Sequence, residues 1–307
     1  MSQTIGRAIG ASEPLVAPDA TRLEQPELPV VPGSAAPAPR RHSDRASAER
    51  LLPRGDLGRF QRSFRNWFSR YLAKLLIKGW FQVRVEHPER FLQEPCVYAF
   101  NHLSWMDPLL FFATFPKEPR LYFYGPKQEN LRRGGRNRFM WWTGIPVPFS
   151  PLKDDLITSV RYVQAVFDSG GALAIAPEGT IHVHEGDLLP FEDGAAYLAL
   201  RAGVPIVPVA ITGISVARFR GLVRIRIGER IDVEGRASKR NVARYSAVAW
   251  HALRAMVAAD REIPPGNRFE RWLTDMFNDW GEGGRAAAAA LPGPDPADVP
   301  IPAAEAR

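Results

Sequence analysis

Cysteine is almost absent from this sequence, since Cys96 is the single one among 307 residues. A disulfide framework and a zinc site built from cysteine thiolates are therefore excluded. Long apolar runs are missing too: no stretch reaches the roughly 18 uninterrupted apolar residues that a membrane-spanning helix needs. The first residues do not combine a charged segment with an apolar one, so we expect no secretory signal.

Aromatic residues are absent from both ends of the chain. Residues 1–55 hold eight prolines and residues 281–307 hold five, and neither segment contains Phe, Trp or Tyr. Such segments bury too little apolar surface to offset the entropy lost on ordering. We therefore expect disordered tails at 1–55 and 281–307, a helix within 56–80, and one folded domain at 81–280.

Acidic residues are outnumbered: 33 Asp and Glu stand against 40 Lys and Arg, a net charge of +7. This balance favours acidic partners such as nucleic acid, anionic lipid or phosphorylated substrates. We expect no nucleic-acid partner, because the basic residues are scattered and none of the usual nucleic-acid-binding modules is present.

Residues 59–80 have the pattern of an amphipathic helix, because apolar residues recur there every three or four positions. Arginines lie off this stripe, and no acidic residue occurs between 59 and 85. Aromatic residues opposite arginines are typical of a helix that lies in a membrane interface. The alternative is a helix that packs on its own domain and exposes a basic face, and we favour the membrane helix. The stripe consists of Phe60, Phe64, Trp67, Phe68, Tyr71, Leu72 and Leu75.

Beyond residue 80, predicted strands alternate with predicted helices. This alternation indicates an α/β fold with a mixed, largely parallel sheet flanked by helices. Short apolar or alternating segments predict strands at 81–85, 96–100, 121–124, 145–148, 172–176, 207–212 and 223–227. Helical spacing and helix-stop residues predict helices at 108–115, 128–142, 154–168, 194–202, 239–259 and 268–280.

A polar motif, residues 101–108, directly follows the predicted strand at 96–100, and functional groups concentrate at such strand ends in α/β folds. Asp107 precedes Pro108 and is a candidate helix cap. The loop is also long enough for Asp107 to fold back onto His102. A carboxylate on one imidazole nitrogen leaves the other nitrogen free to act as a general base.

A second motif, Pro177-Glu178-Gly179-Thr180, also follows a predicted buried strand. A glycine after the glutamate lets both backbone and carboxylate approach a ligand closely, although an ordinary turn is the alternative. The next residues include His182, His184 and Asp187. Two histidines with nearby carboxylates can bind zinc or iron, so a metal-dependent hydrolase is a less favoured alternative to a polar loop.

In this order, the motifs resemble the glycerolipid acyltransferase family that includes the 1-acylglycerol-3-phosphate acyltransferases. The resemblance covers roughly residues 80–230. The family's Asn-His-x4-Asp block matches Asn101, His102 and Asp107, and its Pro-Glu-Gly-Thr block matches 177–180. Its Val-Pro block matches residues 204–209, and Lys127 resembles the family's lysine region.

The resemblance implies transfer of an acyl group from acyl-CoA or acyl-carrier protein to a hydroxyl of a lysophospholipid or glycerol-phosphate-like acceptor. No metal or other cofactor is implied, and Cys96 is expected in the core rather than as a nucleophile. The expected location is peripheral, on the cytoplasmic face of an anionic membrane. A catalytically silent lipid-binding protein of the same fold is the alternative. The implied general-base dyad is His102 and Asp107, and the implied substrate-binding residues are Glu178, Gly179, Thr180 and Lys127.

Two blocks depart from the family pattern. The usual Gly-x-Ile-Pro-Val-x-Arg is here residues 144–149, which end in Pro148-Phe149 without an arginine. Ile181 follows Thr180, where the family usually has Arg or Ser. The family's arginines are thought to hold the acceptor's phosphate, so the sequence leaves the acceptor open. Candidate replacements are Arg132, Arg133, Arg136 and Lys153.

Overall fold

A computed structural model describes residues 42–125, 131, 134–149, 153–260, 266–291 and 293–304. Within these ranges, seven strands form one sheet in the order β1-β7-β6-β2-β5-β3-β4. Strands β6 and β7 pair antiparallel, and the other neighbours pair in parallel. The predicted mixed, largely parallel sheet is therefore confirmed. The strands are β1 (Gln82–Glu86), β2 (Val97–Phe100), β3 (Leu121–Gly125), β4 (Pro146–Pro148), β5 (Ala172–Ile175), β6 (Ile206–Thr212) and β7 (Leu222–Ile227).

The centre of the sheet is formed by β2, β5 and β6, which are buried along their whole length. Strands covered on both faces read as continuous apolar runs, and these three do. Val97 pairs with Leu173 and Ala99 with Ile175, so β2 and β5 run in parallel and end side by side. The loops that follow these two strands therefore begin at the same edge of the sheet.

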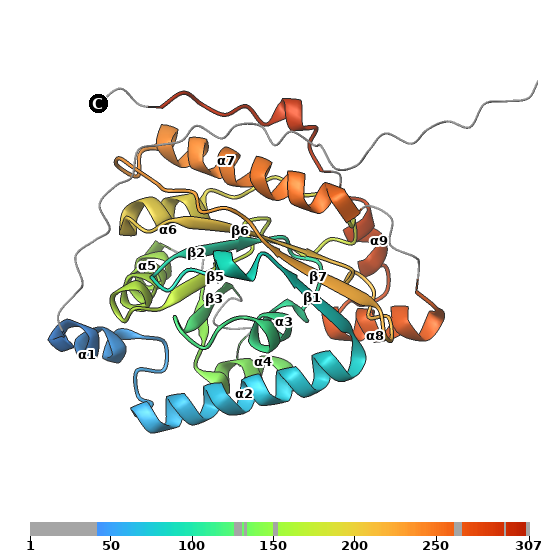
Figure 1. Cartoon of the computed structure of the whole chain (residues 1–307), viewed down its shortest axis with the longest axis horizontal. Helices are drawn as coiled ribbons and strands as arrows, with labels where there is room; N and C mark the ends of the chain where they lie inside the picture. Colours follow the sequence, from blue (N-terminus) through green and yellow to red (C-terminus); the bar gives the residue numbers. More distant parts are fainter. Residues whose placement is uncertain are drawn as a thin grey trace, which may run out of the picture. The chain divides into compact units, whose positions relative to one another are not determined.

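Helices cover both faces of the sheet. Figure 1 shows α6 and α7 on one side, and α2, α3 and α4 on the other. Gly203 ends α6 in a left-handed conformation, with φ of 64°, as its position after the helix predicts. The predicted helix at 128–142 is described only in part, as α4. The helices are α1 (His42–Leu51), α2 (Arg59–Trp80), α3 (Asp107–Thr114), α4 (Gly134–Thr143), α5 (Lys153–Asp168), α6 (Gly194–Ala202), α7 (Lys239–Val257), α8 (Arg268–Asn278) and α9 (Gly284–Ala289).

Helix α2 packs on the domain mostly through a face other than its aromatic stripe, of which Phe68 contacts Trp142. Arg62 and Arg70 are buried, and they donate hydrogen bonds to the backbone carbonyls of Glu49 and Phe115, respectively. The aromatic side chains of the stripe are exposed. The sequence left two alternatives, a membrane helix and a docked helix with a solvated basic face. In the structure the helix is docked through a mixed face that includes two buried arginines as well as Ala73 and Ile77, and its aromatic side chains are exposed.

The ends differ from the predicted tails wherever the structure describes them. Residues 42–51 form α1, which packs on α5, and residues 1–41 lie outside the described residues. Residues 281–304 include α9 and an extended segment against α7. There, the side chains of Arg244 and His251 hydrogen-bond to the carbonyls of Pro302 and Val299, at 3.0 and 2.7 Å. Residues 281–291 and 293–304 therefore differ from the predicted tail, because composition does not reveal stabilisation through backbone carbonyls.

In the described part of the chain, none of the helices combines the length and the apolar character needed to cross a bilayer.

Candidate active site

His102 and Asp107 meet in the loop between β2 and α3. His102 Nδ1 lies 2.8 Å from Asp107 Oδ2, so the contact predicted from their spacing is confirmed. The Asp107 side chain is fully buried, whereas 22% of the His102 side chain is exposed. Asp107 does not cap the helix as its place before Pro108 suggested. It is the first helical residue, and its Oδ2 also accepts the backbone N–H of Ser104 at 3.3 Å.

Burial dominates the electrostatics of the Asp107 carboxyl. It raises the pKa of Asp107 above its ordinary value, and the hydrogen bond and charge attraction of His102 act in the opposite direction. When Asp107 is ionised, it accepts a hydrogen bond from Nδ1–H of His102. The Nε2 lone pair of the imidazole is then available to take a proton.

Asn101 joins the start of this loop to the sheet. Its side-chain Nδ2 donates to the Ile211 carbonyl at 2.8 Å, and its Oδ1 accepts the Ile211 N–H at 2.7 Å. The amide therefore pairs with β6 as a strand residue would, one position beyond the end of β2. His102 follows this anchored residue directly.

Glu178 contacts the backbone of His102 rather than the open site. Its Oε1 accepts the His102 N–H at 2.8 Å, and its Oε2 accepts the Leu189 N–H at 2.7 Å. Glu178 is buried, and its side chain is not among those lining the cavity described below. The sequence resemblance implied a substrate-binding role, whereas these contacts give its carboxylate a role in positioning.

His182 also binds the backbone of His102. Its backbone N–H donates to the His102 carbonyl at 3.2 Å, and its ring Nε2 lies 2.9 Å from Glu178 Oε2. The ring is fully buried. The backbone N–H and C=O of His102 are thus bound by Glu178 and His182. Sequence reasoning placed His182 in a polar loop and missed this role, although its spacing of four residues from Glu178 was visible.

The other predicted substrate-binding residues fall into two groups. Gly179 and Thr180 are exposed and line the cavity next to His102. Gly179 has φ of 67°, a left-handed conformation that glycine adopts without steric cost, and it turns the chain after Glu178. Lys127 lies outside the described residues.

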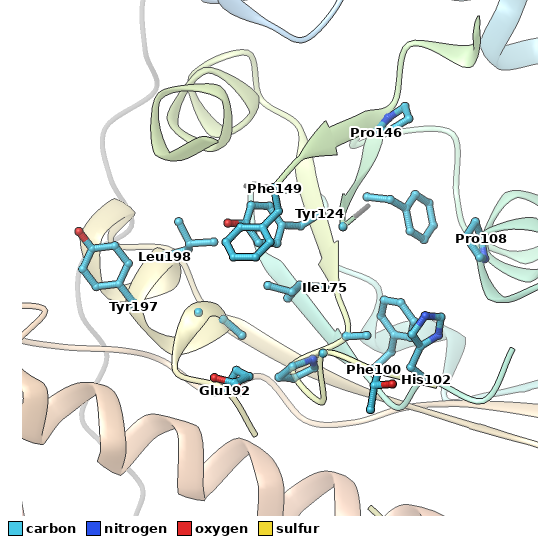
Figure 2. Close-up of a pocket in the computed structure, with 18 of the residues that line it drawn as sticks. Phe100, His102, Pro108, Tyr124, Pro146, Phe149, Ile175, Glu192, Tyr197 and Leu198 are labelled. Carbon is cyan, nitrogen blue, oxygen red and sulfur yellow. The ribbon is translucent and has the colours of Figure 1, made fainter. Parts of the chain in front are cut away.

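A cavity of about 1300 Å³ opens beside His102. Figure 2 shows His102 and Tyr197 on opposite sides of it, with Tyr124, Ile175 and Leu198 along the wall between them. A large, mostly apolar cavity that contains a few polar groups is typical of a ligand site. Its apolar wall is suited to a hydrocarbon chain, and His102 lies at one side of it.

The two histidines that suggested a metal site have different partners. His182 faces Glu178, whereas His184 Nε2 lies 2.8 Å from the carbonyl oxygen of Ala289. Among the residues that the structure describes, no group of three or more His, Cys, Asp or Glu side chains could hold a metal ion.

Asn278, the last residue of α8, holds the turn between His102 and Asp107. Its buried Oδ1 accepts the Ser104 hydroxyl at 3.0 Å and the Trp105 N–H at 2.9 Å. Trp280, just beyond α8, lines the cavity. Sequence reasoning missed both residues, because the 174 positions between Ser104 and Asn278 leave no local pattern that links them.

Comparison with known proteins gives concordant results. Residues 82–212 match the family model described as Acyltransferase. The chain is 33% identical over 168 residues to human 1-acyl-sn-glycerol-3-phosphate acyltransferase beta, covering 48% of this chain and 56% of that protein. It is 31% identical over 144 residues to a probable 1-acyl-sn-glycerol-3-phosphate acyltransferase of Mycoplasma pneumoniae, covering 45% and 52%. The chain thus spans about half the length of these curated relatives.

A solved structure shows the same fold. The 1-acyl-sn-glycerophosphate (LPA) acyltransferase PlsC from Thermotoga maritima superposes with a TM-score of 0.52 at 20% identity. The match covers 71% of this chain and 93% of that one. The family resemblance read from the Asn-His-x4-Asp and Pro-Glu-Gly-Thr motifs is thereby confirmed. Over residues 82–212 the chain is thus similar to the acyltransferase family, both by its family model and by its curated relatives.

Proposed function

We propose that this protein is an O-acyltransferase that moves a fatty acyl group from an acyl thioester to a hydroxyl of a lipid acceptor. One observation carries the proposal: the His102–Asp107 hydrogen bond of 2.8 Å at the wall of a large apolar cavity. A buried carboxylate on one side of an imidazole, with the other side toward a substrate cavity, is the arrangement of a general base.

The reaction needs one base and no covalent enzyme intermediate. Nε2 of His102 takes the proton of the acceptor hydroxyl as its oxygen attacks the thioester carbonyl. Asp107 holds the ring in the required tautomer and compensates the charge of the imidazolium. When the tetrahedral intermediate collapses, the carbon–sulfur bond breaks, and the imidazolium returns the proton to the leaving thiolate. The products are an ester and a free thiol.

The surrounding residues have separate roles in this proposal. Gly179 and Thr180, exposed beside His102, contact the acceptor, and Glu178 fixes the position of His102 through its backbone. Lys127 follows β3, which pairs with β5, and we assign it to an anionic group of a substrate on the family resemblance alone.

The donor is acyl-CoA or acyl-carrier protein, and the acceptor is a lysophospholipid or a glycerol-phosphate-like compound. Phe149 and Ile181 stand where the family has phosphate-binding residues, and both line the cavity. Arg161 and Arg201 are the arginines among the described lining residues, and they are candidates to hold an acceptor phosphate. The acceptors tested must therefore include lipids with and without a phosphate group.

The proposed location is the cytoplasmic face of a membrane, with α2 in contact with anionic lipid. The exposed aromatic residues of α2 and the net charge of +7 support the contact with anionic lipid.

The test is an acyl-transfer assay with the purified full chain. Acyl-CoA or acyl-carrier protein is supplied with detergent-dispersed lysophospholipids and neutral hydroxyl lipids, and products are identified by mass spectrometry. We expect an acylated product and a loss of about 10²- to 10⁴-fold in His102→Asn. The matched control is His87→Asn: His87 is exposed and has a left-handed backbone that asparagine tolerates. An active His102→Asn enzyme would refute the mechanism, and a parent without turnover would favour the silent lipid-binding alternative.

A further inference from the structure

Helix α8 buries polar residues and exposes apolar ones. Glu270, Thr274 and Asn278, spaced four residues apart, face the domain and are buried. On the opposite face, Phe269, Trp272 and Met276 are 56, 56 and 52% exposed. A helix on the surface of a water-soluble domain has the reverse arrangement.

The buried polar face is held by specific hydrogen bonds. Glu270 Oε1 accepts the Phe219 N–H at 3.0 Å, and Thr274 Oγ1 accepts the Ala217 N–H at 2.7 Å. Asn278 binds the catalytic turn at Ser104 and Trp105, as described above. Rotating α8 to bury its aromatic residues would break all of these bonds and leave buried polar groups unpaired, which is costly. The apolar face is thus fixed outward.

The outward apolar surface continues toward α2. Trp80, at the end of α2, donates from Nε1 to the Ala217 carbonyl at 3.0 Å, and its ring lies 5.1 Å from the ring of Phe219. Phe219 is itself exposed, and its backbone is bonded to α8 through Glu270. Figure 1 shows α8 beside the C-terminal end of α2. Helix α2 is similar in part: it buries Arg62 and Arg70 together with apolar Ala73 and Ile77, and it exposes aromatic residues.

Basic side chains flank the apolar face of α8. Arg268 and Arg271 on the helix are exposed, as is Arg220 next to Phe219. The acidic Asp275 on the same helix is paired with Arg285 at 2.8 Å. Large apolar side chains bordered by arginines match the boundary between lipid acyl chains and anionic headgroups. A contiguous exposed apolar patch of this kind marks a binding surface.

We infer that α8 is a second bilayer-contacting helix, whose Phe269, Trp272 and Met276 enter the acyl boundary of an anionic membrane. The inference rests on the proposed function in one respect: a lipid substrate requires the active site to work at a bilayer. Because Asn278 binds the turn of the catalytic loop and Trp280 lines the cavity, contact through α8 brings the cavity to the membrane surface. The sequence pattern had indicated membrane contact for residues 59–80 alone.

A site-specific label tests the contact directly. Cys96 is fully buried, so Met276→Cys introduces a single accessible thiol for an environment-sensitive fluorophore. The probe membranes are phosphatidylcholine vesicles in which about a third of the lipid is anionic phosphatidylglycerol. They are prepared with and without nitroxide-labelled acyl chains. We expect a blue shift and strong quenching at position 276, and neither at the control Ile301→Cys, on an exposed apolar residue of the C-terminal segment. A label at 276 that stays unquenched on vesicle-bound protein would overturn the inference.

A double variant measures the contribution of the helix. Trp272→Ser with Met276→Ser is expected to weaken vesicle binding at least about tenfold and to leave far-UV circular dichroism and Tm unchanged. The matched control, Leu51→Ser with Ile301→Ser, removes two exposed apolar residues elsewhere and should bind like the parent. If the α8 variant binds vesicles like the parent, or only abolishes self-association of the chain, the inference fails.

The outcome is separable from that of the proposed function. Vesicle binding is read without turnover, and turnover is read with detergent-dispersed substrates, which need no bilayer. Failure of the proposed function gives no product with parent or variant, whatever the vesicles show. Failure of the α8 contact gives equal vesicle binding by parent and α8 variant while turnover in detergent persists.

Discussion

Glu178 binds His102 through the main chain of the histidine and not through its ring: Oε1 of Glu178 lies 2.8 Å from the His102 backbone nitrogen. Asp107, by contrast, binds the ring at Nδ1. Two carboxylates thus hold different parts of one residue: Glu178 binds the backbone of His102, and Asp107 binds its imidazole. Residues of the Pro-Glu-Gly-Thr and Asn-His-x4-Asp motifs thus meet at His102.

The first prediction concerns Glu178→Gln. A glutamine retains one acceptor oxygen but turns its amide NH₂ toward a backbone N–H, so His102 should shift. Small displacements of a catalytic group are costly, and we expect kcat to fall about ten- to a hundredfold with little change in KM for the acceptor. Steady-state kinetics measures both values, with the exposed Glu229→Gln as control. A raised acceptor KM at unchanged kcat would instead assign Glu178 to substrate binding.

Asp107→Asn should separate activity from stability. Burial raises the pKa of Asp107 in the folded state, so the folded protein binds this proton more readily than the unfolded chain does. The cost of ionising Asp107 in the folded state therefore develops as pH rises from the unfolded pKa through the raised folded pKa, and it vanishes only below the unfolded pKa. We expect Asp107→Asn to lose up to about 10⁴-fold in rate. Its Tm at pH 8 should equal or exceed that of the parent, by a margin that shrinks toward pH 4. A lower Tm at pH 8 would attribute the lost activity to misfolding.

Cys96 should be inert. The side chain is fully buried next to β2, and burial raises the pKa of its thiol to about 12. At pH 8 only about one molecule in ten thousand carries the reactive thiolate. Titration with a chromogenic disulfide should detect no thiol in the native protein and one in guanidinium chloride. Fast labelling of the native protein would show that Cys96 is accessible to solvent. Inactivation by an alkylating reagent would show that its thiol is needed for activity.

Acyl transfer should survive chelation. His182 and His184 are committed to Glu178 and to the carbonyl of Ala289, and so they are not arranged as metal ligands. Prolonged dialysis against EDTA should leave the rate unchanged, and elemental analysis should find no stoichiometric zinc or iron. Loss of activity on chelation that zinc restores would revive the metal-dependent alternative.

Replacing Phe60, Phe64 and Trp67 in α2 by serine should release the protein from anionic vesicles. All three side chains are exposed, so the helix should keep its place on the domain, and circular dichroism should be unchanged. Phe68 is left intact because its ring packs against Trp142 at 5.8 Å. Cosedimentation of the parent should also weaken as ionic strength rises, because salt screens the basic surface. A folded triple variant that binds as the parent does would exclude α2 as a membrane contact.

Much of the fold could be predicted because its strands lie in a buried, mostly parallel sheet. Residues 97–100 and 172–175 read as apolar runs for that reason, and the glycine at 203 marked a helix end. The His102–Asp107 contact could be predicted as well, because five residues in a strand-to-helix loop allow it. These features depend on local pattern, which a single sequence displays.

The remaining features depend on distant partners. The apolar stripe on α2 was visible in the sequence, but the face of the helix that meets the domain was not. That face contains arginines that donate to the backbone carbonyls of Glu49 and Phe115, and no local spacing reveals these partners. Asn278 lies 174 positions from Ser104, and the segment at 293–304 is held through its carbonyls. The contact of His182 with Glu178 could not be predicted, because the sequence motif does not reveal that the Glu178 side chain points into the protein.

The amide of Asn101 acts as a surrogate peptide group, because it exchanges both of its hydrogen bonds with the Ile211 backbone. His102 therefore directly follows a residue that is anchored to the central part of the sheet. We therefore expect this loop to stay closed as long as the sheet is folded. Inactivation by denaturant should then coincide with cooperative unfolding of the sheet, and the amide hydrogen of His102 should exchange as slowly as those of β2 and β6.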